Sequence, residues 1–279
     1  FQIGSPPIFA GIEFTSMNVI LLSDFSPLSN HMLDYAAMLF KNQEVHFTIL
    51  HIKSPCQKES CSGKCQIIFD AKLQKSKTLL ENVGNGGIHV ETKFIEGSFI
   101  ESIRHVIAEQ KTDLIILGNS SGDTSDTGLF FDKKTLEIIT KIKCPVILVP
   151  EKASLKLPKT ALLPTDFSIT SDYSIFNILT SLNFISKTHL ALLPTGTNEV
   201  LGPNKTQSKA LISKVINSLK FKSVREIPST SKLTNINGYD LIMVMAKNLS
   251  IFQNLFSTSP ASLCRAEVPI LFLHDSRKF

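Results

Sequence analysis

Short apolar runs and stretches of helical spacing alternate along the first half of the chain. Runs of strand length lie at residues 19–22, 45–52, 88–95, 113–117 and 146–149. Between them, apolar residues recur every three or four positions, which is typical of one face of a helix. The predicted faces comprise Leu28, Met32, Tyr35, Ala36 and Leu39, then Ile68, Ala71, Leu79 and Val83, then Phe99, Ile103, Val106 and Ile107, and finally Leu136, Ile139 and Ile142. This alternation predicts an α/β fold, with helices on both faces of a parallel sheet.

Three strand motifs of the first half recur in the same order in the second half. VILLSDFS at 19–26 matches ALLPTDFS at 161–168, DLIILGN at 113–119 matches DLIMVMA at 240–246, and PVILVP at 145–150 matches PILFLHD at 269–275. Three ordered matches indicate an internal duplication. We therefore predict two doubly wound domains of five parallel strands each, at residues 17–151 and 159–275, joined by a polar stretch at 151–159.

The second domain is predicted to be the shorter one. It has fewer residues between Asp166 and Asp240 than the first domain has between Asp24 and Asp113, and residues 229–238, around its third helix, have little periodicity. Its second helix persists, with Leu211, Val215 and Leu219 on one face.

Residues 1–16 (FQIGSPPIFAGIEFTS) show no hydrophobic period and precede Met17. We interpret them as a leader added for expression and leave them out of the fold prediction. No apolar run approaches the ~20 residues that cross a bilayer, and no segment has the pattern of a secretory signal peptide. Five cysteines in 279 residues do not indicate a secreted disulfide framework. The sequence thus predicts a cytoplasmic protein that does not insert into membranes.

Composition and charge narrow the classes of function. Hydrophobic residues make up 43% of the chain and charged residues 19%, which predicts a folded chain with a sizeable core. The net charge is +5, but the lysines and arginines are scattered rather than gathered in a stripe. This pattern argues against nucleic acid as a partner.

Two loops are predicted to meet at the carboxyl edge of the first sheet, where open parallel sheets bind ligands. One is Ser23-Asp24-Phe25-Ser26, after the first strand, and the other runs from Gly118 to Lys134, after the fourth. Glycines let a backbone approach phosphates, and a helix N-terminus offers unpaired N–H groups. Asp24 either binds a ribose hydroxyl or adenine amino group, or acts with Ser26 only as a turn and helix cap. In the alternative interpretation, the loop that begins at Gly118 is only a surface connection between elements.

These motifs together resemble the universal stress protein family. The resemblance is carried by the strand–Asp-Phe-Ser–helix order, by Leu50-His51-Ile52, by DLIILG at 113–118 and by CPVILVP at 144–150. It implies a five-stranded parallel sheet and pairing of domains through their last strands. Many members bind ATP through a loop Gly-x-x-Gly, nine residues, then Gly-Ser or Gly-Thr. The candidate residues for a nucleotide site in this sequence are Asp24, Phe25, Ser26, Ile52, Gly118, Gly122, Gly128, Lys133 and Lys134.

This sequence departs from that phosphate-binding loop. Ser121 stands where the second glycine belongs, with Gly122 one place late, and Asp132-Lys133 replaces the terminal Gly-Ser. The second domain has Met245-Ala246-Lys247 at the first glycine, although Asp166 keeps the carboxylate.

We expect the Asp132 side chain to cap the fourth helix and to occupy N–H groups that a phosphate would use. Asp123 and Asp126 add negative charge in the same loop, so ATP binding is predicted to be weak or absent. In the alternative, Lys133 and Lys134 hold the phosphates, and the aspartates hold Mg²⁺.

The remaining chemistry-bearing residues are the cysteines. Cys56, Cys61 and Cys65 lie close together after the second predicted strand, and with His51 they could supply four zinc ligands. Their spacing differs from the paired Cys-x2-Cys of common zinc sites, so redox-active thiols and an inert loop remain alternatives. Cys144 and Cys264, before the final strands, are predicted to be buried and structural.

Two hypotheses about function follow from these patterns. No nucleophile–base pair is evident, so we predict a protein without catalytic activity. The first hypothesis is a stress-response binding or adaptor module whose two domains pack as an intramolecular pseudo-dimer, with a homodimer as a further arrangement. The second is an ATP-binding switch, with Mg²⁺ and slow hydrolysis, that uses the first domain. The sequence does not identify a protein partner.

Overall fold

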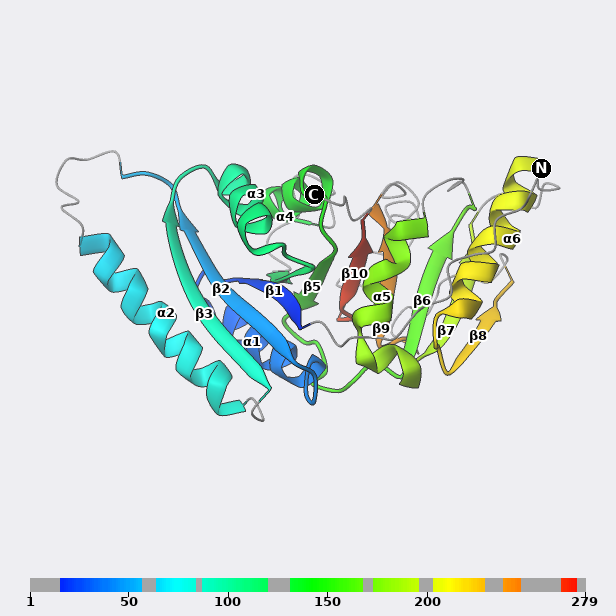
Figure 1. The fold of residues 1–279 in the computed structure, drawn as a ribbon, viewed down its shortest axis with the longest axis horizontal. Coiled ribbons are helices and arrows are strands. Elements are labelled where there is room, and N and C mark those ends of the chain that lie inside the picture. Colours follow the sequence, from blue (N-terminus) through cyan, green and yellow to red (C-terminus); the bar gives the residue numbers. More distant parts are fainter. Residues whose placement is uncertain are drawn as a thin grey trace.

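One sheet of ten strands runs through the part of the chain that the computed structural model describes (Figure 1). The described residues are 16–56, 64–83, 87–119, 131–167, 173–195, 203–228, 238–246 and 267–274. The strands are β1 (Met17–Leu22), β2 (Val45–Lys53), β3 (Ile88–Glu96), β4 (Leu114–Asn119), β5 (Val146–Pro150), β6 (Thr160–Thr165), β7 (His189–Pro194), β8 (Ser223–Glu226), β9 (Leu241–Met245) and β10 (Ile270–Leu273). The helices are α1 (Pro27–Leu39), α2 (Lys64–Val83), α3 (Phe99–Gln110), α4 (Lys133–Lys141), α5 (Asn177–Ser181) and α6 (Pro203–Ser218), with 3-10 turns η2 (Tyr173–Phe176) and η3 (Asn183–Lys187).

The first five strands form an all-parallel half-sheet in the order β3-β2-β1-β4-β5. β1 lies in the middle, with β2 on one side and β4 on the other. The chain order reverses between β1 and β4, which makes their carboxyl ends the switch point of the sheet. The predicted doubly wound α/β fold is confirmed.

The second five strands repeat this order as β8-β7-β6-β9-β10, again all parallel. β10 pairs with β5 in the antiparallel sense, with Ile270 opposite Leu148 and Phe272 opposite Val146. The two half-sheets thereby become one sheet. Neither β5 nor β10 presents an open edge to which another strand could add.

Two large apolar layers lie on the two faces of the sheet, and a small separate cluster of Leu162, Ala191 and Leu193 lies in the second half. Successive residues of a strand point to opposite faces, so Leu21 belongs to the layer under α1, α2, α5 and α6, whereas Ile20 belongs to the layer under α3 and α4. The second layer crosses the junction between the halves, where the Phe131 and Phe272 rings meet edge to face with centroids 5.6 Å apart. The core is therefore shared by both halves.

An aspartate makes an equivalent backbone hydrogen bond in each half. Asp113, just before β4, accepts a hydrogen bond from the Asn18 N–H at 2.9 Å. Asp240, just before β9, accepts hydrogen bonds from the N–H groups of Lys159 and Thr160 at 2.9 and 3.0 Å. Each aspartate thus holds the start of the first strand of its half, and the sequence duplication extends to this hydrogen bond.

The halves differ most clearly in the element after their first strand. The first half has the continuous 13-residue α1, whereas the second has three short pieces, η2, α5 and η3. The α5 helix ends at Leu182, whose φ of −96° and ψ of 103° are extended. These pieces still bury the apolar side chains that a helix would bury, among them Phe176, Leu179 and Phe184.

The predicted inward face of α2 is wrong, and that of α6 is only partly right. On α2, Ile68, Leu79 and Val83 are exposed, and the helix buries Leu73, Ser76 and Leu80 instead. Of the face predicted for α6, Leu219 just after the helix is buried and Val215 packs against the core, but Ile212 and Ile216 rather than Leu211 are the fully buried residues of the helix. Both helices lie at the outer ends of the sheet (Figure 1). Because apolar residues occur on more than one side of each, periodicity alone did not select the packed side.

No helix in the described ranges has the length and apolar character needed to cross a bilayer. The predicted leader lies almost entirely outside the described residues, which begin at Ser16.

Replacing Phe272 by Ala should test the shared core. The ring is fully buried at the junction, so its removal leaves a cavity, and we expect the free energy of unfolding to fall by about 3–5 kcal/mol. Urea unfolding measures the change. Leu155→Ala, at a side chain that is 48% exposed, is the control and should change stability by about 0.5 kcal/mol or less. An equal, small effect of both substitutions would contradict a core that continues across the junction.

Candidate functional site

The turn after β1 is held by its own side chains. The Asp24 carboxylate accepts hydrogen bonds from the Ser26 N–H at 2.9 Å and from the Ser29 hydroxyl at 2.5 Å. Ser26 caps α1, because its hydroxyl accepts a hydrogen bond from the Ser29 N–H at 3.2 Å. Partial burial raises the pKa of Asp24, but the hydrogen bonds from Ser26 and Ser29 outweigh burial, and the pKa lies below its ordinary value. The Asp24 carboxylate is therefore already engaged in the turn.

Phe25 has a left-handed backbone conformation that is unusual for a bulky residue. Its φ is 64°, and its N–H donates to the Ser23 hydroxyl at 3.2 Å. The second half repeats this turn, since Phe167 has a φ of 56° and donates to the Thr165 hydroxyl at 3.1 Å. A left-handed phenylalanine is held only where its surroundings over-determine it. The conformation is thus a built feature of both Asp-Phe-Ser motifs.

An aromatic cluster lies beside this turn in the first half. The His51 ring at the end of β2 lies 4.5 Å from both the Phe25 ring and the Phe69 ring of α2, and 6.0 Å from that of Phe94 on β3, between centroids. The Lys72 ammonium lies over the Phe25 ring at 5.4 Å. This cluster was not predicted, because its members come from four segments.

His51 is fixed by a hydrogen bond to the turn after β1. Its Nδ1 lies 2.7 Å from the Ser23 carbonyl oxygen, which accepts the Nδ1 proton. Burial lowers the pKa of His51, and the Lys72 and Lys134 ammonium groups add to this, although Ser23 and Asp24 act in the opposite direction.

The second half repeats one further contact of this cluster. The Lys209 ammonium of α6 lies over the Phe167 ring at 5.3 Å, as Lys72 of α2 lies over Phe25. The two halves therefore share the turn, its strained phenylalanine and the cation above that ring.

Ile52 and Gly118 have packing roles at the switch point. Ile52 packs in the layer under α3 and α4, with Phe99. Gly118 on β4 lies so close to α1 that a Cβ on it would come within 2.6 Å of the Leu28 Cγ. Next to it, the buried Asn119 carbonyl Oδ1 has no hydrogen-bond partner among the described residues. Gly122 and Gly128 lie outside the described residues, so their predicted role stays a prediction.

The start of α4 is capped by a side chain, as expected. The Asp132 carboxylate accepts hydrogen bonds from the Thr135 N–H at 2.9 Å and from the Thr135 hydroxyl at 2.8 Å. The Leu136 N–H donates to the Asp132 carbonyl. Lys133 and Lys134 are exposed, and the Lys134 ammonium lies over the Phe99 ring at 5.5 Å. Both lysines stand next to the switch point, but Asp132 already occupies the Thr135 amide.

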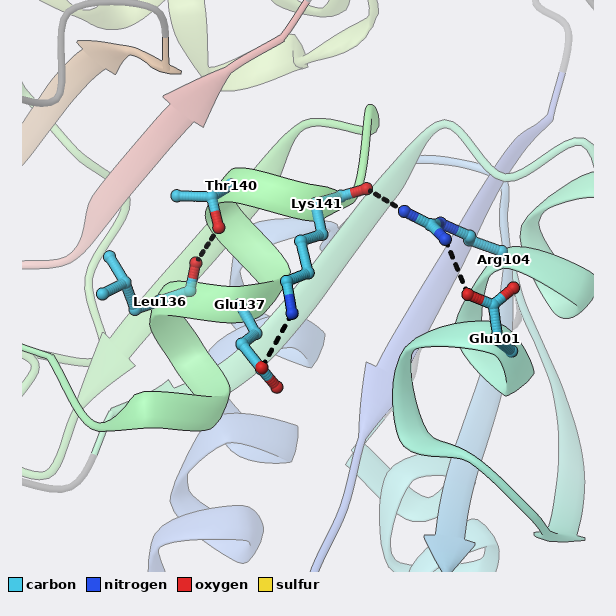
Figure 2. A network of polar contacts seen from close by, with 6 residues as sticks. All are labelled: Glu101, Arg104, Leu136, Glu137, Thr140 and Lys141. Carbon is cyan, nitrogen blue, oxygen red and sulfur yellow. Dashed lines mark hydrogen bonds and ion pairs between the residues drawn. The ribbon is translucent and has the colours of Figure 1, made fainter.

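The other end of α4 is held by α3 (Figure 2). The Arg104 guanidinium donates to the Lys141 carbonyl at 3.0 Å and to the Glu101 carboxylate at 2.6 Å. The Lys141 ammonium in turn pairs with Glu137 at 2.8 Å. A carbonyl at a helix C-terminus lacks an intrahelical partner, so Arg104 supplies one. Both ends of α4 are therefore fixed.

The cysteines do not form a metal centre in the described part of the chain. No group of three or more His, Cys, Asp or Glu side chains there is placed to hold a metal ion. Cys56 and Cys65 lie together, with their Sγ atoms 3.9 Å apart, but the His51 ring belongs to the aromatic cluster. Cys61 lies outside the described residues. Cys144 is buried as predicted, and burial raises the pKa of its thiol strongly.

A cavity of about 360 Å³ lies between the halves, away from the switch point. Its lining includes Thr112, Asp113, Cys144 and Pro145, which precede β4 and β5, together with His274 after β10. It therefore opens at the amino ends of the first-half strands, where ligands of open parallel sheets do not bind. We base the candidate site on the switch point, because the predicted residues converge there.

The first half has the features of one known family. It combines a five-stranded parallel sheet in the order 3-2-1-4-5 with the Asp-Phe-Ser turn at its switch point. The sequence profile of the Universal stress protein family matches residues 16–150. Residues 16–150 are a universal stress protein domain.

Two of the solved structures compared with this chain share its fold over both halves. A universal stress protein from Archaeoglobus fulgidus DSM 4304 is 17% identical, with 95% of this chain and 99% of that chain covered and a TM-score of 0.60. A functionally unknown protein from Pseudomonas aeruginosa PAO1 is 10% identical, with 94% of each chain covered and a TM-score of 0.51. A universal stress protein solved in complex with cAMP is 18% identical over 48% of this chain and 97% of that chain, with a TM-score of 0.38. The sequence matches none of the curated proteins with which it was compared.

Gly118→Ala should destabilise the universal stress protein domain through packing alone. The added methyl group clashes with Leu28, so we expect the free energy of unfolding to fall by about 1–3 kcal/mol. In a Leu28→Ala background the same change should cost less, because the obstructing side chain is gone. Gly238→Ala is the control, as its Cβ would meet nothing within 4 Å. Equal costs with and without Leu28 would contradict this role for Gly118.

The low pKa of His51 predicts a loss of stability in mild acid. Above the unfolded-state pKa of about 6.5 the ring is neutral in both states. As pH falls below that value, the unfolded chain takes up the proton first, so the free energy of unfolding falls until the lower pKa of the folded state is reached. His51→Asn, which keeps a donor for Ser23, should flatten this dependence in urea unfolding between pH 7.5 and 5. The exposed His105→Gln should leave it as it is, and an unchanged slope in His51→Asn would contradict the assignment.

Proposed function

We propose that this chain is a non-catalytic binding or adaptor module of the universal stress protein type, which binds ATP weakly or not at all. The observation that carries this proposal is the Asp132 cap. Its carboxylate occupies the Thr135 amide and places a negative charge at the helix start where the resemblance puts a phosphate. Helix N-termini attract anions through unpaired N–H groups and the helix dipole, and an aspartate there offsets both.

Electrostatics supports the same conclusion. A carboxylate at 4–8 Å from a phosphate charge costs about 2–4 kcal/mol at an effective dielectric constant of about 20. Lys133 and Lys134 act in the opposite direction, but the Lys134 ammonium lies over the Phe99 ring. Asp24 is likewise engaged, by Ser26 and Ser29.

The paired arrangement of the halves also suits an adaptor. We propose that β5 and β10 act as the contact of an intramolecular pseudo-dimer, since their antiparallel pairing takes the place of a contact between two separate chains. The switch points of the two halves then lie on one rigid sheet. Neither the pairing of β5 with β10 nor the shared sheet requires a bound nucleotide.

An ATP-binding switch is the second candidate, and one observation favours it. The buried Asn119 Oδ1, at the carboxyl end of β4, has no hydrogen-bond partner among the described residues. A buried acceptor of this kind is costly unless it meets a donor, and a bound molecule or a water could provide one. In this candidate Lys133 and Lys134 bind the phosphates together with Mg²⁺.

Calorimetric titration of the purified chain with Mg²⁺–ATP separates the two candidates. The adaptor function predicts no binding heat for the wild-type chain. Asp132→Gly frees the Thr135 amide and removes the charge, so it should raise the affinity for Mg²⁺–ATP by about tenfold or more, each factor of ten corresponding to about 1.4 kcal/mol. Glu137→Gln removes one charge farther along the same helix and is the matched control.

Two results would count against the proposal. Stoichiometric binding of ATP by the wild-type chain, or release of bound nucleotide on denaturation, would establish the switch instead. If Asp132→Gly folds, as judged by circular dichroism, and binds no better than Glu137→Gln, the Asp132 cap is not what limits nucleotide binding.

A further inference from the structure

Two cysteines and a lysine meet where β2 ends and α2 begins. The Cys56 and Cys65 sulfur atoms lie 3.9 Å apart, and both side chains are thiols rather than a disulfide. The Lys53 ammonium donates a hydrogen bond to the Cys56 sulfur. All three side chains are half-buried, so small reagents can reach them. This cluster is separate from the switch-point residues and has no part in the proposed function.

The backbone around Cys56 is fixed in this arrangement. The Cys56 N–H donates to the Glu96 carboxylate at 2.7 Å, and Glu96 lies opposite Lys53 in the β2–β3 register. Cys65 is the second residue of α2, so its position is set by a helix. The two sulfur atoms are therefore brought together by ordered elements on either side of residues 57–63.

We propose that Cys56 and Cys65 form a reversible disulfide in response to hydroperoxides, with Cys56 as the attacking thiol. A disulfide bond is about 2.05 Å long, so the two sulfur atoms, which lie 3.9 Å apart, must approach by roughly 2 Å. An ammonium group beside a thiol favours the reactive thiolate. The negative charge of the Glu96 carboxylate disfavours the Cys56 thiolate. Glu96, however, accepts its hydrogen bond from the Cys56 backbone N–H, whereas the Lys53 ammonium contacts the sulfur itself.

The reaction balances with a hydroperoxide as the oxidant. The Cys56 thiolate attacks the terminal oxygen of the hydroperoxide, the O–O bond breaks, and the alcohol or water leaves after taking up a proton. Cys56 is then a sulfenic acid. Cys65 attacks its sulfur, the S–S bond forms, and the hydroxyl group leaves as water with the Cys65 proton. Two thiols lose two electrons in total, and the hydroperoxide gains them.

The contacts of Lys53 are consistent with Cys56 reacting before Cys65. The hydrogen bond to Cys56 is the largest cause that raises the pKa of Lys53, and Cys65 adds a smaller contribution. Lys53 therefore remains an ammonium group at neutral pH. The buried Cys144, whose thiol pKa is raised, offers an unreactive cysteine in the same chain for comparison.

Oxidation would tie the first turn of α2 to the end of β2. These two elements supply Phe69 and His51 to the aromatic cluster at the switch point. The disulfide would thus fix the base of α2 against the strand that it neighbours.

Peptide mapping after hydrogen peroxide treatment of the whole purified chain tests the proposal. We expect a Cys56–Cys65 disulfide within one chain, which dithiothreitol reverses, and no modification of Cys144. Cys65→Ser should stop the reaction at a Cys56 sulfenic acid that dimedone traps, and Cys56→Ser should give no trapped product at Cys65. Cys61→Ser, which leaves the pair intact, should still form the disulfide.

Lys53→Met tests the role of the ammonium group. At pH 7 its Cys56 should react about fivefold to tenfold more slowly with hydrogen peroxide, and Lys53→Arg should restore most of the rate. A disulfide that involves Cys61, links only separate chains or fails to form would overturn the proposal. An unchanged rate in Lys53→Met would overturn the assignment of Cys56 as the lysine-activated thiol.

Discussion

The antiparallel pairing of β5 with β10 is the contact on which this structure depends. A five-stranded parallel sheet ends in a strand whose N–H and C=O groups are unpaired on one side, and such an edge invites aggregation. Here each half closes the open edge of the other. The apolar layer under α3 and α4 then continues from Phe131 to Phe272, so burial of side chains follows from the same pairing. Duplication of the unit within one chain makes this contact intramolecular and independent of concentration.

Within each half, a small number of repeated contacts fixes the two ends of the first strand. Asp113 and Asp240 hold the start of the first strand, and Phe25 and Phe167 turn the chain at its end with the same left-handed backbone. The lysine above each phenylalanine comes from the second helix of its half. The same contacts therefore hold both ends of the first strand in each half. This agreement supports duplication of a folded unit more strongly than the matching strand letters do.

The sequence was sufficient for the strands of the first half and for the Asp132 cap, because these depend on local pattern: apolar runs and a helix-capping residue at the expected place. It did not predict the order of the strands in the sheet, and it was insufficient for the packed side of α2 and for part of that of α6. On α2, exposed apolar residues such as Ile68 and Leu79 look, in the sequence, like residues that pack on the sheet. Only the position of the helix at the end of the sheet shows which of its sides is buried. The aromatic cluster around His51 and the lysine beside Cys56 were also missed. Both require knowledge of which strand ends lie side by side.

What the two halves share and where they differ bears on function. The shared contacts all hold the sheet, the first turn or the second helix, and they would be retained by any protein that needs the fold. Among the features that the resemblance ties to ATP, the second half keeps Asp166 but has Met245-Ala246-Lys247 at the position of the first glycine, and the first half has Asp132 as the cap of α4. The contacts that recur in both halves are therefore those that hold the sheet, the first turn and the second helix, and the residues at the position of the phosphate-binding loop are not among them.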